Sequence, residues 1–400
     1  SYCFDPGKSG RERGFASASA FDAPILVPFC PESTLSGVTH RDFIEAMWYQ
    51  RPLDIPADWQ GRRILLHFGG VDYACEAFVD GQSVGRHWGG SASFTFDITR
   101  CVTPGGRHNL VLAVEDETRS GVQPCGKQSQ AYFSHRCVYT RTTGIWQTVW
   151  LEAVHPCGLA AIQVLPDLDG ARFVILPRFH APGVGQRLRI TLLDGSATVS
   201  QVEAPAADGV PWVLPVAQPK PWSPEQPFLY DLHCEVLGPH GEVLDCVQSY
   251  AGLRKVHIEG NRLFLNNAPL YLRLVLDQGF YPDGIWTAPS DAALRRDIEI
   301  ALRAGFNGAR LHQKVFEDRF HYWADRLGYL TWGESPSWGM DIKDPLAARN
   351  FLSEWREVVV RDRNHPSIIA WTPLNETSDV GDGRQHNRVH IDAYELTRAL

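Results

Sequence analysis

Ser367-Ile-Ile-Ala-Trp-Thr-Pro-Leu-Asn375-Glu376 is the stretch that decides the fold of the last third of the chain. Its apolar run predicts a short buried strand, and an Asn-Glu pair stands at the carboxyl end of that strand. A (β/α)8 barrel carries its chemistry at the carboxyl ends of its strands. The stretch therefore predicts a barrel strand that delivers a potential general acid/base to the barrel mouth.

Three strand-helix units precede this stretch. Apolar runs predict strands, Ser290 predicts a helix start, and Gly305 and Gly328 predict helix ends. The expected strands are 270–275, 306–312, 329–334 and 367–376, with helices after 290, around 320–327 and across 351–360. Alternating strands and helices with buried strands predict a parallel sheet.

Residues 255–400 are therefore expected to form the first half of an α/β TIM (β/α)8 barrel, strands one to four. Half a barrel leaves two open sheet edges, which are an aggregation hazard. We expect the natural polypeptide to continue past Leu400. The chain opens at Ser1 without Met or a signal-like apolar stretch, so we also expect its start to be truncated.

Two all-β segments are predicted ahead of the barrel. Residues 1–153 show short alternating strands typical of a jelly-roll sandwich, with Ile64, Leu66 and Phe68 on one face. Asp80-Gly81 predicts a type I′ hairpin turn. Residues 154–254 have the length and alternation of an immunoglobulin-like β-sandwich.

Composition excludes several classes of partner. The 400 residues carry a net charge of −8, and no apolar run approaches the roughly 18 residues of a membrane-spanning helix. We therefore expect a soluble protein without nucleic acid or membrane partners, and its compartment stays open between cytoplasmic and periplasmic or secreted. Assembly into a homo-oligomer in the full-length protein also stays open.

The nine cysteines contain no Cys-x-x-Cys pair. This pattern indicates neither a zinc site nor a dense disulfide framework, and we expect most of the cysteines to be buried as small hydrophobic residues. No cofactor is predicted. A structural or auxiliary divalent cation stays open, because the loops offer oxygen ligands without a recognisable spacing.

Polar and charged side chains follow all four predicted barrel strands, which places them together at one mouth. They are Asp277, Arg310, His312, Glu334, Asn375 and Glu376. A glycosidase needs one carboxyl group to protonate the leaving oxygen and a second carboxylate to attack or to activate water. We predict Glu376 as the acid, with Asn375 on a sugar hydroxyl and Arg310 orienting a carboxylate.

Less specific interpretations accompany these roles. Glu334 and Asp277 are equally compatible with salt bridges that stabilise loops, and His312 is better explained as a structural or substrate-contacting residue than as a general base. Trp371 is expected either to stack on a sugar face or to pack in the core. The first segment contains no persuasive sugar-binding cluster.

With these residues in view, the chain resembles glycoside hydrolase family 2, which contains β-galactosidases, β-glucuronidases and β-mannosidases. The resemblance rests on ordered matches along the chain: residues 27–37, 144–152, 222–230 and 252–254, together with Asn375-Glu376. It implies a sugar-binding jelly roll, an immunoglobulin-like domain and a barrel, and retaining hydrolysis through a glycosyl-enzyme intermediate.

The resemblance implies that Glu376 is the acid/base and that Asn375 is the neighbouring residue that binds the sugar 2-hydroxyl. It also implies that Arg310 corresponds to the arginine of strand two. The nucleophilic Glu belongs to strand seven, beyond the end of this chain, so the 400 residues alone are predicted to be inactive. Arg310-Leu-His312-Gln313 replaces the common Arg-x-Ser-His, and Leu272 to Asp277 departs from the common Leu-Arg-Gly-Val-Asn run, which suggests a different glycone preference.

The sequence thus predicts a retaining exo-β-glycosidase on a small carbohydrate, most of all a β-galactosidase-like enzyme. The alternatives are a β-glucuronidase or β-mannosidase of the same family, or a noncatalytic carbohydrate-binding or scaffold protein.

Overall fold

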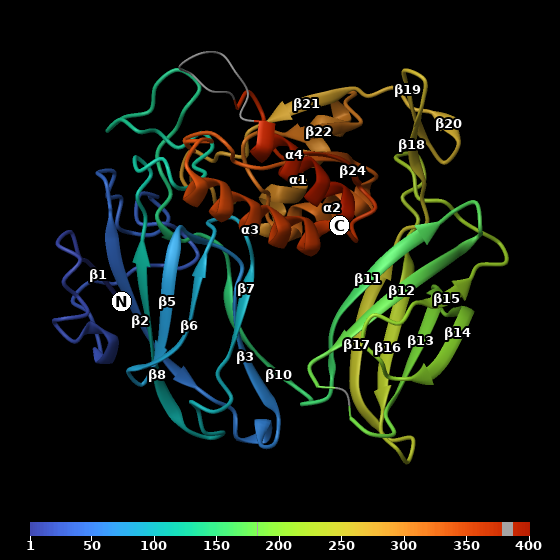
Figure 1. Cartoon of the computed structure of the whole chain (residues 1–400), viewed down its shortest axis with the longest axis horizontal. Coiled ribbons are helices and arrows are strands. Elements are labelled where there is room, and N and C mark those ends of the chain that lie inside the picture. Colours follow the sequence, from blue (N-terminus) through green and yellow to red (C-terminus); the bar gives the residue numbers. More distant parts are fainter. Residues whose placement is uncertain (182, 378–386) are drawn as a thin grey trace.

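The structure is a computed structural model that describes residues 1–181, 183–377 and 387–400. Two β-sandwiches lie side by side, and a helix-flanked parallel sheet lies above them in the view of Figure 1. Chain order follows the same division: the first sandwich is blue to teal, the second green to yellow, and the parallel sheet orange to red.

The first sandwich contains a five-stranded sheet in the order β1-β2-β8-β5-β6, a three-stranded sheet in the order β10-β3-β7, and the short pair β4-β9. Its strands are β1 Tyr2–Phe4, β2 Ala46–Asp54, β3 Arg63–Phe68, β4 Val71–Asp72, β5 Ala74–Val79, β6 Gln82–Trp88, β7 Phe94–Asp97, β8 Arg107–Glu115, β9 Gly144–Ile145 and β10 Val149–Val154. Helix is confined to two single-turn 3-10 segments, Phe15–Ser17 and Ala57–Trp59.

Alternation along the strands builds the core of this sandwich, as the sequence predicts. Ile64, Leu66 and Phe68 each expose 1% of their surface and share one cluster with Leu112. The predicted hairpin joins β5 to β6 through Asp80 and Gly81, whose φ angles of 49° and 82° match a type I′ turn.

The second sandwich pairs a three-stranded sheet, β11-β12-β15, with a four-stranded sheet, β14-β13-β16-β17. Its strands are β11 Leu159–Asp167, β12 Arg172–Phe179, β13 Arg187–Asp194, β14 Ala197–Pro205, β15 Trp212–Pro215, β16 Tyr230–Leu237 and β17 Val243–Ala251. The predicted inward face of Leu188, Ile190 and Leu192 is fully buried. Each sandwich therefore has a hydrophobic core of its own.

A small antiparallel meander that the sequence analysis missed follows the second sandwich. It consists of β18 Val256–Glu259, β19 Arg262–Leu265 and β20 Ala268–Pro269. The first barrel strand was predicted at 270–275 but is β21 Leu274–Asp277. Leu270 and Leu272 pack instead with Trp222 of the second sandwich, so their apolar character serves contact between units rather than sheet pairing.

The last unit contains four parallel strands in chain order, β21-β22-β23-β24, as predicted. The later strands are β22 Gly308–Leu311, β23 Leu330–Glu334 and β24 Ile368–Thr372, and the helices are α1 Asp291–Arg303, α2 Asp318–Leu327, α3 Pro345–Asp362 and α4 Asn387–Ala399. Strand four was predicted to reach residue 376 but ends at Thr372, because Pro373 has no N–H for the ladder.

Local signals set the helix ends. The Ser290 side chain accepts a hydrogen bond from the backbone N–H of Ala293, which caps α1 as predicted. Gly328 ends α2 with a φ of 72°, a left-handed conformation that glycine adopts at little cost.

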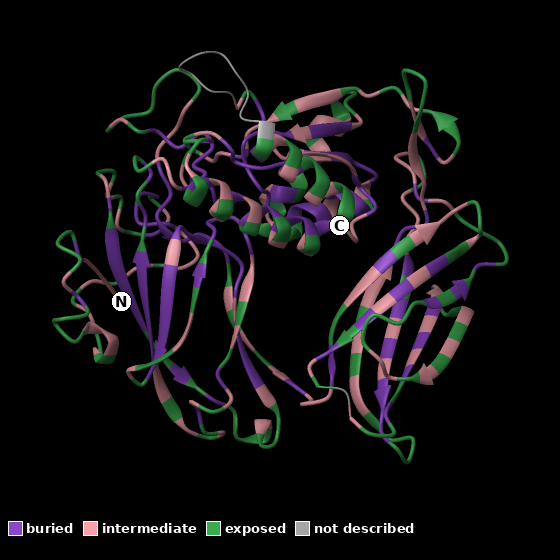
Figure 2. Ribbon diagram, in the orientation of Figure 1, coloured by how far each residue is buried: buried purple, intermediate pink, exposed green. Residues whose placement is uncertain are grey.

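Contacts between units hold the parallel sheet in place. The Arg254 guanidinium, at the end of the second sandwich, donates to the carbonyls of Pro366 and Ile368 at the start of β24. On the other side, Glu354 of α3 accepts from the backbone N–H of Ser91 in the first sandwich. Figure 2 shows buried residues running from the strands of the first sandwich into the loops that meet the helical unit.

Two further predictions have structural outcomes. All nine cysteines are free, and only four of them are buried, so the prediction that most are buried is wrong. Within the described residues, no helix has the length and apolar character needed to cross a bilayer.

Candidate active site

The carboxyl ends of β22, β23 and β24 meet at one polar cluster, centred on Arg310. Its Nε donates to Glu334 Oε2 at 2.8 Å, and its Nη2 donates to Asn375 Oδ1 at 2.5 Å. Adjacent parallel strands explain this meeting, because residues at their carboxyl ends emerge at the same edge of the sheet. One guanidinium thus connects three strand ends.

Glu334 is the buried carboxylate of the cluster, with no exposed side-chain surface. Its Oε1 accepts from the backbone N–H of Gln313 at 3.0 Å, and Arg310 binds its other oxygen. Gln313 has a φ of 55°, which aims its N–H at the carboxylate from a conformation that non-glycine residues rarely adopt. Both oxygens of Glu334 are therefore held, which suits a fixed positioning group.

His312 lies beside the same carboxylate. Its Nδ1 is 3.0 Å from Glu334 Oε1, although the angle is not that of a hydrogen bond. Burial lowers the pKa of His312, and the Lys127 and Arg310 charges lower it further against the opposing effect of Glu334. A neutral imidazole at neutral pH fits the expected contact role.

Asn375 follows β24 and is 8% exposed. Its side-chain oxygen is bound by Arg310, while its Nδ2 is buried without a hydrogen-bond partner in the described part of the chain. An unpartnered buried donor is costly unless a ligand satisfies it. The amide is therefore oriented as a donor to a ligand oxygen, such as a sugar hydroxyl.

Glu376 is exposed and has a φ of 47°, again in the left-handed region. Among the described residues, its carboxylate forms no hydrogen bond or ion pair. A strained backbone at a strand mouth is a recurrent feature of functional sites. This free carboxylate next to the fixed Asn375 is the group best placed to exchange a proton with a ligand.

Asp277 ends β21 but is not bonded to the cluster through its side chain. Its Oδ1 accepts from the backbone N–H of Gly279 at 2.9 Å, and its carbonyl accepts from the N–H of His312. Desolvation raises the pKa of this carboxyl group. The structure thus brings Arg310, His312 and Asn375 together and leaves the Asp277 carboxylate in its own loop.

Trp371 is also separate from the cluster. Its ring meets Trp355 of α3 edge to face at 5.6 Å and belongs to the apolar cluster between sheet and helices. Trp332, two residues before Glu334, donates through Nε1 to Thr372 Oγ1 at 2.7 Å.

Two residues that the sequence analysis missed complete the site, both in the loop after β23. Trp338 Nε1 donates to the Asn375 carbonyl at 3.0 Å, and Ser337 Oγ accepts from the Asn375 N–H at 3.3 Å. They fix the backbone on both sides of the Asn375 side chain. Both residues lie within four positions of the predicted strand end at Glu334, and this position could have indicated that they belong to the site.

One group of three metal-ligating side chains occurs in the described residues: Asp318, Asp362 and His365. His365 Nε2 already lies 3.1 Å from Asp318, and Arg361 binds Asp362. The group stands at the start of α2 and the end of α3, and none of its residues bonds to the Arg310 cluster in the described part of the chain. We assign it a structural role.

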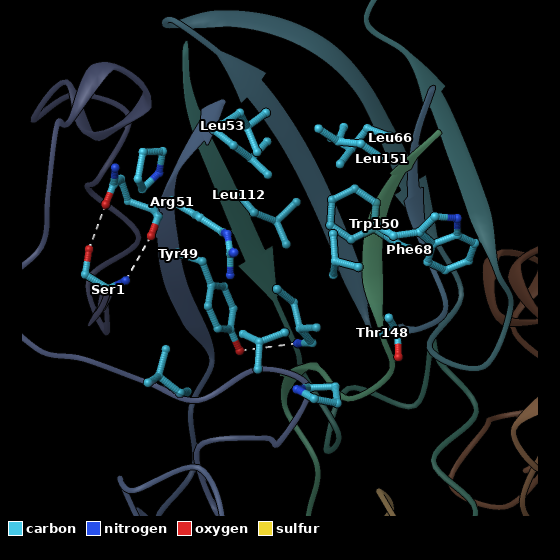
Figure 3. A pocket seen from close by; sticks show the side chains of 18 of the residues that line it. Ser1, Tyr49, Arg51, Leu53, Leu66, Phe68, Leu112, Thr148, Trp150 and Leu151 are labelled. Carbon is cyan, nitrogen blue, oxygen red and sulfur yellow. Dashed lines mark hydrogen bonds between the residues drawn. The ribbon is translucent and has the colours of Figure 1, made fainter. Parts of the chain in front are cut away.

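A cavity of about 600 Å³ lies elsewhere, within the first sandwich (Figure 3). It lies between the two sheets, where Leu53 of β2 and Leu112 of β8 face Leu66 of β3 and Leu151 of β10. Asp54 is the one acidic residue among its lining residues. The cavity therefore lacks a carboxylate pair, and the candidate active site is the polar cluster at the strand ends.

Comparison with known families accounts for most of the chain. Residues 15–151 match the family model described as glycosyl hydrolases family 2, sugar binding domain. Residues 186–254 match the model described as glycosyl hydrolases family 2, and residues 256–400 match the model of the family 2 TIM barrel domain. The chain belongs to glycosyl hydrolase family 2. The resemblance inferred from the sequence is confirmed.

Relatives of this family 2 chain carry names for two sugars. A β-glucuronidase of Paenibacillus borealis is 26% identical over 94% of the chain and 66% of its own length. A β-galactosidase of Thermoanaerobacter pseudethanolicus is 25% identical over 90% of the chain and 48% of its own length. The chain thus spans about half to two thirds of these two relatives.

Solved structures share the fold of the family 2 chain. The β-glucuronidase from Ruminococcus gnavus in complex with D-glucuronic acid superposes with a TM-score of 0.87 at 23% identity. The match covers 100% of this chain and 69% of the other. The multidomain arrangement of sugar-binding, immunoglobulin-like and TIM-barrel domains is therefore that of the family.

Proposed function

We propose that the protein containing these 400 residues is a retaining exo-β-glycosidase. In this proposal residues 1–153 are a jelly-roll domain, 154–254 an immunoglobulin-like domain, and 255–400 the first four strand-helix units of the catalytic barrel. The observation that carries the proposal is the Arg310 bridge to Glu334 and Asn375, beside Glu376, whose carboxylate has no partner among the described residues.

Each residue of the cluster has a role in this reaction. Glu376 protonates the glycosidic oxygen as it leaves, then removes a proton from the water that releases the sugar. Asn375 donates its unpartnered Nδ2–H to a hydroxyl of the sugar. Arg310, held by the buried Glu334, keeps the Asn375 amide in that orientation. The nucleophilic carboxylate is expected on a later barrel strand, outside these residues.

The glycone has two leading candidates, a β-galactoside and a β-glucuronide, because relatives named for both sugars match the chain at similar identity. The sequence analysis favoured the β-galactoside, with a β-mannoside as a further alternative. A panel of nitrophenyl β-glycosides with the full-length protein separates these candidates.

An alkyl glycoside of the sugar that the panel identifies tests the proposed role of Glu376, because its leaving oxygen must be protonated, whereas a nitrophenyl leaving group needs little help from an acid. Removing a general acid typically costs 10²- to 10⁴-fold in rate, so we expect a loss of that order for Glu376→Gln on the preferred sugar. Glu395→Gln is the matched control. Glu395 is also an exposed glutamate, but it lies on α4, and the variant should hydrolyse the substrate at the wild-type rate.

A noncatalytic carbohydrate-binding protein is the alternative. It predicts that the full-length protein binds sugars but hydrolyses no member of the panel. Hydrolysis of the alkyl glycoside that survives Glu376→Gln unchanged would instead reject the assigned acid while leaving the enzyme class intact.

A further inference from the structure

A segment of the first sandwich, residues 125–139, packs against the candidate active site. The backbone N–H of Cys125 donates to the Trp338 carbonyl at 2.8 Å, and that of Gly126 donates to the Pro336 carbonyl at 2.9 Å. A Cβ at Gly126 would lie 2.4 Å from the Gln313 carbonyl oxygen. Only glycine permits this approach, which brings the next residue, Lys127, to the loop after β23.

Lys127 is a buried cation, with 3% of its surface exposed. Its Nζ donates to the Cys137 carbonyl at 3.1 Å and lies 4.4 Å from the centre of the Trp338 ring. In the described part of the chain it has no carboxylate partner. Since a buried charge is costly without compensation, the π face of Trp338 is a principal stabiliser of this ammonium group.

Trp338 transmits this contact to two residues of the site. Its Nε1 donates to the Asn375 carbonyl at 3.0 Å, and its ring meets the His312 ring edge to face at 5.9 Å. Its backbone N–H donates to Gln313 Oε1. The indole therefore links Lys127 of the first sandwich with residues that follow β22 and β24.

We propose that Lys127 is a positioning residue for the active site. It fixes the Trp338 ring from the first sandwich, and Trp338 in turn fixes Asn375 beside Glu376. The inference rests on the proposed glycosidase function. It assigns the first sandwich a direct part in aligning the acid/base region, beyond any sugar binding of its own.

The electrostatics agree with this placement. Lys127 is one of the charges that lower the pKa of His312, after burial and against Glu334. Replacing Lys127 with an uncharged residue should therefore raise the pKa of His312. This charge effect acts through space, so it shows that Lys127 lies near His312 and does not by itself report the contact through Trp338.

The test uses the full-length protein with Lys127→Met, which keeps most of the volume but loses the charge, and Lys127→Arg, which keeps both the charge and a cation–π contact. Lys220→Met is the matched control, because Lys220 also lies over an aromatic ring, Phe228, at 4.7 Å, but in the second sandwich. We expect Lys127→Met to lower kcat by about tenfold or more with a smaller change in KM. Lys127→Arg should recover most of the loss, and Lys220→Met should match the wild type.

The double variant Lys127→Met/Trp338→Phe tests the pathway. Trp338→Phe removes the indole N–H, so the two losses should be less than additive if Lys127 acts through Trp338. Additive losses, or a Lys127→Met loss no larger than that of Lys220→Met, would overturn the proposal. If Lys127→Met fails to fold, Lys127→Gln, which also removes the charge, takes its place, and its loss must again be less than additive with that of Trp338→Phe.

A measurement that needs no activity separates the role of Lys127 from the proposed glycosidase function. If the wild type hydrolyses no glycoside, the function falls, and the solvent exchange of the Trp338 indole N–H, measured by NMR, still decides the role of Lys127, because this N–H donates to the Asn375 carbonyl. Faster exchange in Lys127→Met but not in Lys220→Met supports the contact through Trp338, and unchanged exchange refutes it.

Discussion

The Arg310 guanidinium donates to Asn375 Oδ1 at 2.5 Å, across 65 residues of sequence. The bond occupies the oxygen of the Asn375 amide, while the Nδ2 has no hydrogen-bond partner among the described residues, so the amide can offer its N–H to a ligand. The orientation of one side chain at β24 thus depends on an arginine at β22.

Arg310→Lys should be a severe change for this reason. Lysine keeps the charge but cannot bind Glu334 and Asn375 together in one planar fork. Charge-assisted hydrogen bonds contribute about 1.5 to 3 kcal/mol, so we expect kcat/KM of the full-length protein to fall about 10- to 100-fold. A lowered melting temperature, from the weakened hold on the buried Glu334, should accompany the reduced kcat/KM. Full activity in Arg310→Lys would contradict the assigned role.

His365 predicts a dependence of stability on alkaline pH. Burial alone would lower its pKa, but the carboxylates of Asp325 and Asp318, at 2.6 and 3.1 Å, outweigh burial and raise it to about 10. A raised folded pKa stabilises the fold fully below the unfolded value of about 6.5, and that contribution is lost as pH rises through about 10.

His365→Gln leaves the Asp325 carboxylate buried without its cation, which typically costs about 3 to 5 kcal/mol at pH 7. Denaturant unfolding at pH 7 and pH 10 checks this expectation. The difference between wild type and variant should shrink at pH 10. A difference that is constant across this range would show that the charge of His365 is not the stabilising feature.

Two buried carboxyl groups predict a second pH effect. Desolvation raises the pKa of Glu32 to about 8 and that of Glu354 to about 7. Because the folded pKa values are raised, the stabilisation is complete below about pH 4.5 and is lost as pH rises to about 8. The unfolding free energy of the wild type should therefore decline across this window.

Glu32→Gln should flatten that decline, because glutamine can still accept the hydrogen bond from the Thr143 N–H and has no proton to lose. Thermal unfolding at pH 5 and pH 8 provides the measurement, with Glu395→Gln as an exposed control. If the stability of Glu32→Gln falls between pH 5 and pH 8 as much as that of the wild type, the ionisation of Glu32 is not the cause of the decline.

Gly328 and Gly305 form a matched pair for backbone strain. Both have positive φ angles at helix ends, 72° and 91°. A Cβ at Gly328 would lie 2.4 Å from the Pro224 carbonyl oxygen of the second sandwich, whereas a Cβ at Gly305 meets nothing within 4 Å. We expect Gly305→Ala to cost about 1 kcal/mol and Gly328→Ala clearly more, by chemical denaturation. Equal costs would argue against the close contact with Pro224.

The sequence predicted much of the fold because its patterns are local. Alternation such as Ile64, Leu66 and Phe68 places a half-buried strand, and Asp80-Gly81 or Ser290 act within their own turn. Apolar runs predicted all four parallel strands. The start of the first strand was misplaced because Leu270 and Leu272 are apolar for another reason: they pack against Trp222 of the second sandwich.

The site was predicted in part, for a related reason. Residues next to strand ends, such as Arg310 and Asn375, are found from topology alone. Trp338 and Lys127 act through contacts between distant loops, which no local pattern encodes. The packing of Trp371 on Trp355 depends on which face of β24 meets α3, and an apolar strand without alternation leaves that choice open.

Leaving-group dependence is the most direct test of the central claim, that Glu376 is the acid/base of a β-glycosidase. Wild type and Glu376→Gln of the full-length protein are compared on an alkyl glycoside, which needs protonation, and on a dinitrophenyl glycoside, which does not. We predict a loss of kcat/KM of about 10²-fold or more on the alkyl glycoside and a much smaller loss on the activated one. Equal losses on both substrates would contradict the assignment of Glu376 as the acid.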